Sequence, residues 1–342
     1  MADNSPAGRI QVIDAFRGIA ILAVMAYHYT VRWPDLYGYS AEYSELFSLG
    51  QLGVHLFFVV SGLVITMTVL RSDNAFQFAA RRVARLYPAF VVAAIATFVI
   101  MRLAGPERFQ YSAFDLVASL TMDARALGRN YIDGAYWSLA VEVKFYFYVA
   151  LARLLLREHF WMGIVGLAVL AALPFGATWS YVLIAEWWPY LLLGMAGWFW
   201  IFEHRHREGA TLAAASVLLY MVHRPGGLLA DAFIWVLALS MLLALRVAPS
   251  WAPLPMRGLA WVGAISYSLY LLHQNIGVSL IGYLTRNGMP DIAAMMVAGA
   301  ATMSLGHLSF NYVEKPGARL VMGLYGRIRG PKPLGPKESA PA

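Results

Sequence analysis

Long apolar stretches dominate this sequence and constrain its fold more than any other feature. A helix that crosses the hydrocarbon core of a bilayer needs about 20 mostly apolar residues. Ten segments approach or meet that length, namely 11–31, 51–70, 86–104, 137–157, 160–175, 181–202, 210–223, 228–247, 258–284 and 291–312. Of the 342 residues, 60% are apolar and 13% are charged, about half of the charged fraction of a soluble domain. We therefore expect an all-α, polytopic integral membrane protein with about ten transmembrane helices, and we exclude a soluble globular enzyme.

The distribution of Lys and Arg predicts the orientation of these helices. With the N-terminus inside, 17 of the 26 Lys and Arg fall on the inner side and 7 on the outer side. Cytoplasmic loops carry such an excess, so we expect both termini to be cytoplasmic. We predict one transmembrane domain over 1–325 and a disordered, basic cytoplasmic tail over 326–342. The longest loop, 105–136, would lie outside, and loops of that length are usually functional or partly structured.

The first apolar segment contains three ionisable residues, Asp14, Arg17 and His28. Such residues are costly inside a bilayer and mark functional sites. Arg17 and His28 are about three helical turns apart, so they share one face at roughly 16 Å. Asp14 lies one turn before Arg17 and can pair with it. The alternative is an anchoring arginine and an interfacial histidine that reaches water.

Two arginines stand near the start of the third segment. Arg82 and Arg85 are three residues apart and are therefore neighbours on a helix. Paired guanidinium groups suit a phosphate or pyrophosphate, because each can bind bidentately. Anionic lipid headgroups are the alternative ligand.

Polar residues recur at helical spacing in two later segments. Ser138 and Glu142 share a helix face, and a carboxylate inside a span should have a partner. Ser266, Tyr270 and His273 fall close to one face, and Tyr267 lies beside them. Such a hydroxyl-rich stripe lines either a helix contact or a wet cavity. Cysteine is absent, which excludes an acyl-cysteine intermediate and a thiolate metal site, and we expect no metal.

These elements, in this order and spacing, resemble the acyltransferase 3 family of integral-membrane acyltransferases from about Ile10 to Arg319. The matching motifs are the Arg17–His28 pair, FFxxSG at 57–62, RxxR with Tyr-Pro at 82–88, WSLxxE at 137–142, SYxxYxxH at 266–273 and Glu-Lys-Pro at 314–316. Two positions depart from the family pattern: His55 replaces a frequent acidic residue, and Val143 replaces a frequent second glutamate. Many members carry a fused extracytoplasmic hydrolase-like domain. We expect none here, so transfer would be completed within the membrane domain.

The resemblance implies an enzyme of the bacterial inner membrane that transfers an acyl group, most often acetyl, from acyl-CoA to a hydroxyl of a carbohydrate or glycoside acceptor. The expected partners are acyl-CoA, the acceptor and the lipid bilayer, and no nucleic acid. On this interpretation the CoA phosphates would bind Arg17, Arg82 and Arg85 at the cytoplasmic mouth, with Tyr87 beside them.

The motifs also imply catalytic roles. His28 would act as general base, since its ordinary pKa of about 6.5 suits proton transfer near neutral pH. Glu142 would orient that imidazole, and Ser138 and Tyr270 would donate hydrogen bonds to the tetrahedral oxyanion. The remaining motif residues assigned to the site are Asp14, Ser61, Trp137, Ser266, Tyr267 and His273.

A multi-pass transporter or flippase is the main alternative. Buried Arg, His and Glu also mark substrate and proton pathways, although the sequence shows no internal repeat of the kind that transporters carry. The sequence leaves open the acceptor, the acyl length, the choice between direct transfer and a covalent relay, and the oligomeric state.

Overall fold

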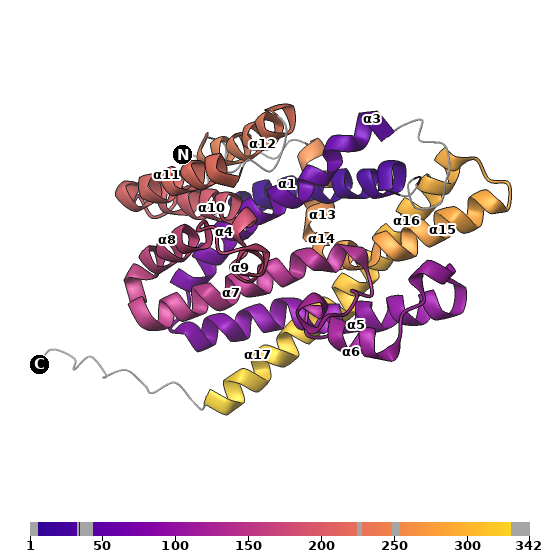
Figure 1. The fold of residues 1–342 in the computed structure, drawn as a ribbon, viewed down its shortest axis with the longest axis horizontal. Coiled ribbons are helices and arrows are strands. Elements are labelled where there is room, and N and C mark those ends of the chain that lie inside the picture. Colours follow the sequence, from indigo (N-terminus) through magenta and orange to yellow (C-terminus); the bar gives the residue numbers. More distant parts are fainter. Residues whose placement is uncertain (1–5, 33, 35–43, 224–227, 248–253, 330–342) are drawn as a thin grey trace, which may run out of the picture.

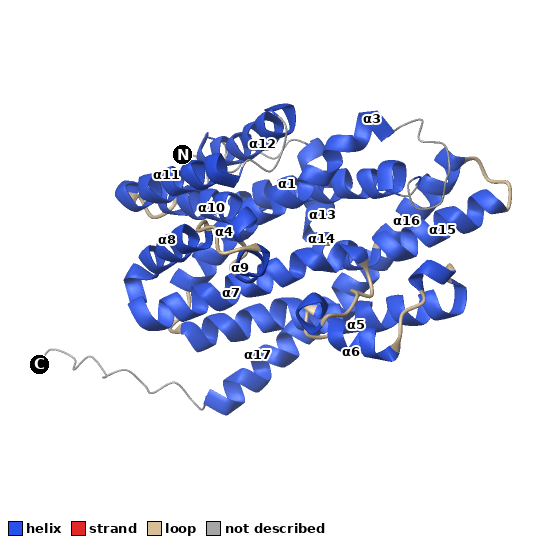
Figure 2. Ribbon diagram, viewed as in Figure 1, coloured by secondary structure: helices blue, strands red, loops and turns tan. Residues whose placement is uncertain are grey.

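The computed structural model describes residues 6–32, 34, 44–223, 228–247 and 254–329. Within these ranges all regular secondary structure is helical (Figure 2). The all-α prediction is therefore confirmed for the part of the chain that the structure describes.

Four long helices surround the centre of the molecule and position most of the motif residues. They are α1 (Pro6–Tyr27), α4 (Gly53–Leu70), α5 (Ala75–Ala104) and α7 (Trp137–Leu156), and they run roughly along the long axis of the molecule (Figure 1). α4 packs against α1, α7 and α10, and α5 packs against α7. The other longer helices are α8 (Phe160–Ala171), α10 (Trp188–Ile201), α11 (His206–His223), α12 (Leu228–Val247), α16 (Asp291–Ser309) and α17 (Lys315–Arg329). Short helices α3 (Ser44–Phe47), α6 (Ala113–Ser119) and α9 (Ala177–Val182) lie in the connections.

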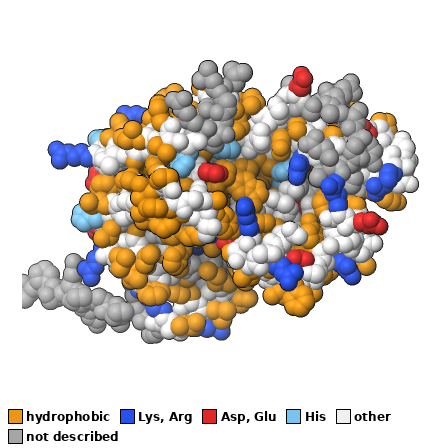
Figure 3. All heavy atoms as spheres, viewed as in Figure 1, with side chains coloured by type: hydrophobic (Ala, Val, Ile, Leu, Met, Phe, Trp, Pro, Cys, Tyr) orange, Lys and Arg blue, Asp and Glu red, His pale blue; other side chains and the backbone are white. Residues whose placement is uncertain are grey.

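Four helical stretches in the described ranges are long and apolar enough to cross a membrane: Gln11–Arg32, Ser48–Leu70, Ala75–Ala104 and Asp291–Arg329. They include the first, second, third and tenth predicted segments. The third begins at Ala75 rather than at 86. Figure 3 shows hydrophobic side chains over the left and centre of one face, with Lys and Arg gathered towards the right. Soluble proteins rarely expose apolar patches that large, so the apolar helices are those of a membrane protein, while the count of ten spans stays a prediction.

The predicted segment 258–284 is divided into three helices: α13 (Leu254–Ala264), α14 (Ser266–Leu272) and α15 (Gln274–Arg286). At the second break, the Asn275 N–H donates to Asp133 (2.9 Å), and the Tyr136 hydroxyl donates to the Leu271 carbonyl (3.1 Å). The Tyr29 hydroxyl adds a bond to the His273 carbonyl (3.0 Å), which also accepts from the Gly277 N–H. Irregular backbone is tolerated at membrane depth where protein surrounds it, which is the situation of this buried stretch.

Two π-helical turns interrupt otherwise continuous helices. One spans His28–Arg32 and follows α1; the other spans Phe310–Glu314 and joins α16 to α17. π-turns of this kind occur frequently at functional sites, and here each carries a residue of a family-like motif. After the second π-turn, α17 continues to Arg329, so the start of the predicted tail is helical. The rest of that tail lies outside the described residues.

Glycines allow the closest helix contacts. A Cβ on Gly263 of α13 would overlap with the Asp14 carbonyl oxygen of α1, and a Cβ on Gly18 would overlap with the Leu259 carbonyl oxygen. Gly62 of α4 lies equally close to the Leu191 backbone of α10. Small residues at helix interfaces permit such approach in membrane proteins. These contacts hold α1, α13 and α4 in place around the central cavity.

Candidate functional site

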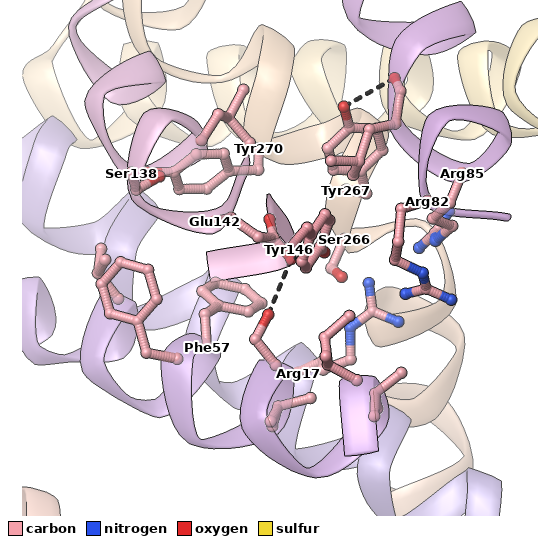
Figure 4. Close-up of a pocket in the computed structure, with 18 residues that line it drawn as sticks. Arg17, Phe57, Arg82, Arg85, Ser138, Glu142, Tyr146, Ser266, Tyr267 and Tyr270 are labelled. Atoms are coloured by element: carbon pink, nitrogen blue, oxygen red, sulfur yellow. Dashed lines mark hydrogen bonds between the residues drawn. The ribbon is translucent and has the colours of Figure 1, made fainter. Parts of the chain in front are cut away.

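A cavity of about 110 Å³ lies among α1, α4, α5, α7 and α14, and we call it the chamber. It brings together side chains from five of the sequence motifs: Arg17, Ser61, Arg82, Arg85, Ser138, Glu142, Ser266, Tyr267 and Tyr270. Arg17, Arg82 and Arg85 lie at one side, and Ser138 and Tyr270 lie at the other (Figure 4). Pockets that enclose a whole small molecule usually measure roughly 300–1,000 Å³. The chamber therefore fits only part of a molecule as large as CoA.

Three guanidinium groups form the cationic side of the chamber. Arg17 pairs with Asp14 at 3.4 Å, as the spacing on α1 predicts. Arg82 donates to the Thr68 hydroxyl at 3.0 Å, and its Nε has no partner among the described residues. Each guanidinium of Arg82 and Arg85 also lies over a tyrosine ring. The unused donors on this side are available to an anionic ligand.

Arg85 is held by a residue of the second π-turn. Its guanidinium forms an ion pair with Glu314, whose side chain is only 3% exposed, and the Ser268 hydroxyl donates to the same carboxylate at 2.7 Å. The Arg85 side chain is 30% exposed, because its other face borders the chamber. Glu314 thus fixes the position of a chamber arginine from a helix that does not line the chamber.

Glu142 lies between the two sides of the chamber, and its partners differ from those predicted. The Ser61 hydroxyl donates to Glu142 Oε1 at 2.8 Å, and the Tyr146 hydroxyl donates to the same oxygen. The bond from Ser61 ties α7 to α4, whereas the prediction paired Glu142 with His28. The expected pairing fails because Glu142 lines the chamber, while His28 lies outside its lining.

Ser138 and Tyr270 form the neutral polar side. Their hydroxyl oxygens are 2.8 Å apart, and both lie within hydrogen-bond distance of the Ala135 carbonyl, at 3.2 and 2.9 Å. The carbonyl oxygen has two lone pairs, so the two hydroxyl protons go either both to Ala135 or one to Ala135 and one to the other hydroxyl oxygen, and a proton in the second position can turn. The pair can therefore offer a hydrogen bond to a new acceptor in the chamber. The buried Ser266 hydroxyl, which also lines the chamber, has no partner among the described residues.

His28 lies behind this side, and its partner is His273. His28 Nδ1 is 3.0 Å from His273 Nε2, and His273 Nδ1 is 2.8 Å from the Tyr270 carbonyl oxygen. The carbonyl can only accept, so a neutral His273 carries its proton on Nδ1 and accepts at Nε2. A neutral His28 then donates from Nδ1, which leaves its Nε2 with a free lone pair. The imidazole of a general base needs this tautomer.

Besides Asp14, His28 and His273, two more predicted residues lie outside the chamber lining. Tyr87 is exposed, and its hydroxyl donates to the Leu120 carbonyl at 3.1 Å. Trp137 faces the other side of α7, where its ring lies 5.0 Å from that of Trp187. Neither arrangement puts these side chains beside the three arginines. Tyr87 follows Arg82 and Arg85 in sequence but projects from a different face of α5.

Two residues that contact chamber side chains were given no role from the sequence. Tyr146 lies one turn after Glu142, and that spacing could have identified it as the partner of the carboxylate. Glu314 lies in the Glu-Lys-Pro motif, but nothing in the sequence shows its contact with Arg85 across the fold. In the described ranges, no group of three or more His, Asp or Glu side chains could hold a metal ion.

Comparisons with known proteins identify the family of the chain. The family described as "Acyltransferase domain" matches residues 10–308. Peptidoglycan O-acetyltransferase OatA of Listeria monocytogenes is 24% identical over 89% of this chain and 55% of its own length. Nodulation protein 10 of Rhizobium leguminosarum is 24% identical over 80% of this chain and 84% of its own, and an O-acetyl transferase of Shigella phage Sf6 is 26% identical over 39% and 42%.

The chain spans about half the length of the OatA proteins that it matches. No solved structure matches it. The family match covers all of the motif positions on the chamber wall, from Arg17 to Tyr270, and both histidines behind it. The chain therefore belongs to the acyltransferase 3 family.

Proposed function

We propose that this enzyme transfers an acetyl group from acetyl-CoA to a hydroxyl of a carbohydrate or glycoside acceptor. The observation that carries the proposal is the distribution of charge in the chamber, which has a cationic side and a neutral polar side. Three arginines line one side, and the hydroxyl pair of Ser138 and Tyr270 closes the other (Figure 4). The His273 ring lies next to that of Tyr270, and His28 contacts His273. An acyl-CoA has the same polarity, since its phosphates and its thioester are at opposite ends.

The arginines supply the donor end of the site. Arg17, Arg82 and Arg85 bind the phosphates of CoA, with Arg82 and Arg85 suited to bidentate contacts. The chamber is too small for a whole CoA, so the phosphates stay at the arginine side, the pantetheine arm enters, and the adenosine lies outside. Asp14 and Glu314 neutralise part of this charge and fix two of the three guanidinium groups.

The histidine pair supplies the base. His28 Nε2 takes the proton of the acceptor hydroxyl while the hydroxyl oxygen bonds to the thioester carbon. Ser138 and Tyr270 donate hydrogen bonds to the developing oxyanion. The tetrahedral intermediate then releases CoA as its thiolate, which takes the proton from His28. Direct transfer needs no acyl-enzyme, in keeping with the absence of cysteine.

Purified protein in lipid nanodiscs, given radiolabelled acetyl-CoA and an oligosaccharide of N-acetylglucosamine, tests the reaction. We expect labelled sugar from the wild type and at least a 100-fold slower reaction from His28→Ala. Arg82→Ala should weaken acetyl-CoA binding while His28→Ala leaves it unchanged. Full transfer by a folded His28→Ala protein would remove His28 from the mechanism. A burst of released CoA without acceptor would favour a covalent relay over direct transfer.

The proposed topology has ten spans, cytoplasmic termini and the loop 105–136 outside, in a bacterial inner membrane. The chain contains no cysteine, so single cysteines can be introduced without any background. Asn130→Cys in that loop should react with a membrane-impermeant maleimide added to intact cells. His159→Cys, in the exposed turn between α7 and α8, should react only after lysis. The reverse pattern would overturn this orientation.

A further inference from the structure

A second, larger cavity lies on the opposite face of α7 from the chamber. Its volume is about 360 Å³, within the range of roughly 300–1,000 Å³ typical of small-molecule sites. We call it the aromatic cavity, because four rings line it: Tyr131, Trp137, Tyr181 and Trp187. It is formed by α7, the loop 105–136 and the segment 177–187. The mechanism derived above makes no use of it.

The two tryptophans form an open aromatic wall. The rings of Trp137 and Trp187 are 5.0 Å apart and tilted by 38°, and both side chains are only partly buried. Phe58 packs behind Trp187 at 4.9 Å and also lines the chamber. Aromatic rings that keep one face accessible offer apolar area together with a polar edge. A saccharide ring has the complementary form, with C–H groups on its faces and hydroxyls around its rim.

A network of hydrogen bonds fixes the polar groups of the cavity. The Asp123 carboxylate accepts from Lys144 Nζ at 3.0 Å and from the hydroxyls of Tyr131 (3.2 Å) and Tyr181. Lys144 Nζ also lies 3.4 Å from the centre of the Tyr181 ring. These side chains are therefore held before any ligand arrives, which lowers the entropic cost of binding.

The charges of the cavity largely cancel. Burial raises the pKa of Asp123, but the hydrogen bonds from Tyr181 and Lys144 outweigh burial, and the pKa lies below its ordinary value. Asp123 is thus ionised at neutral pH and compensates Lys144. Arg125 and Glu186, which also line the cavity, have opposite signs. This balance suits the hydroxyls of an uncharged sugar better than a phosphate or a carboxylate.

The cavity is adjacent to the reacting groups. Trp137 lines the cavity, while the next residue, Ser138, lines the chamber. Phe58 separates the two spaces and contacts both Trp137 and Trp187. We propose that the aromatic cavity binds an uncharged saccharide ring of the acceptor, which directs a neighbouring hydroxyl past Phe58 into the chamber. The role as an acceptor site rests on the proposed acetyl transfer, whereas the binding of sugar does not.

Photo-crosslinking tests the binding directly. The full-length protein in nanodiscs is irradiated with an N-acetylglucosamine tetramer carrying a diazirine, and the labelled peptides are located by mass spectrometry. We expect label on the segments 131–144 and 177–187, and an excess of the untagged tetramer should suppress it. Label elsewhere, or label that untagged sugar does not suppress, would overturn the proposal.

Four variants refine this test. Trp187→Ala should reduce the competed label and raise the KM for the sugar at least tenfold, with kcat and the Kd of acetyl-CoA little changed, while Trp187→Phe should restore most of the affinity. Ser180→Trp fills the cavity without removing any buried contact and should have the same effect as Trp187→Ala. Trp200→Ala is the matched control. Trp200 is a tryptophan of α10 that does not line the aromatic cavity and is 44% exposed.

The outcomes separate the two proposals. Suppose that untagged sugar suppresses labelling of the cavity but no acetylated sugar forms. This result would refute the proposed function and leave the binding site in place. Acetylated sugar with an unchanged KM in both Trp187→Ala and Ser180→Trp would refute the acceptor site and leave the function in place.

Discussion

Replacement of Arg85 by leucine would leave the Glu314 carboxylate buried with one hydrogen bond, from Ser268. An exposed ion pair contributes roughly 0–1 kcal/mol, whereas removing one partner of a buried pair costs about 3–5 kcal/mol. Glu314, at 3% exposure, belongs to the second class, and the 30% exposure of Arg85 favours the lower end of that range. We therefore expect Arg85→Leu to destabilise the protein by about 3 kcal/mol, which is a change of about 150-fold in the unfolding equilibrium.

A second substitution should recover most of that loss. Glutamine at position 314 has no charge and can still accept from Ser268, so Arg85→Leu/Glu314→Gln should be more stable than Arg85→Leu alone by about 2 kcal/mol. Unfolding in detergent, followed by tryptophan fluorescence, measures this difference. The midpoint temperature of the single variant should fall by an amount on the order of 5 °C.

A measurement of acetyl-CoA binding distinguishes the effect of Arg85 on ligand binding from its effect on stability. Arg85 borders the chamber, so both Arg85→Leu proteins should bind acetyl-CoA weakly although their stabilities differ. The reasoning is refuted if Arg85→Leu unfolds at the wild-type temperature, or if adding Glu314→Gln destabilises it further. Either result would show that the carboxylate does not depend on Arg85.

Three further predictions follow from other parts of the structure. His273→Ala removes the acceptor that orients His28, and kcat should fall by about 100-fold with an unchanged Kd for acetyl-CoA; transfer at the wild-type rate would contradict this. Burial raises the pKa of Asp133 to about 6, so the native state holds this proton between about pH 4 and 6 while the unfolded chain does not. Stability should therefore fall as the pH rises through about 6, and Asp133→Asn should abolish that part of the pH dependence in thermal melts. Gly263→Val forces a side chain against the α1 backbone and should lower the yield of folded protein in size-exclusion chromatography, whereas Gly166→Val, where the structure leaves open space, should not.

The sequence predicted which residues line the chamber better than it predicted their hydrogen bonds and ion pairs. Arg17, Arg82, Glu142 and Tyr270 line one cavity, as their motifs implied. Helical spacing predicts neighbours on one helix, and it correctly paired Asp14 with Arg17. It carries no information on which helices face each other.

Contacts between distant segments were therefore missed. His28 meets His273 rather than Glu142, and Arg85 meets Glu314, in both cases across more than 200 residues of sequence. The segment 258–284 was recognised as irregular from its polar residues. Its division into three helices depends on partners such as Tyr136 and Asp133, which come from other parts of the fold.

The same long-range pairings have a consequence for biogenesis. His28 enters the membrane with the first helix to be synthesised, but the ring that sets its tautomer is 245 residues further along. The carboxylate that holds Arg85 follows later still. A nascent or truncated chain can contain the three chamber arginines and His28 and still lack the partner that orients His28. Both pairings therefore form only after nearly the whole chain has been synthesised.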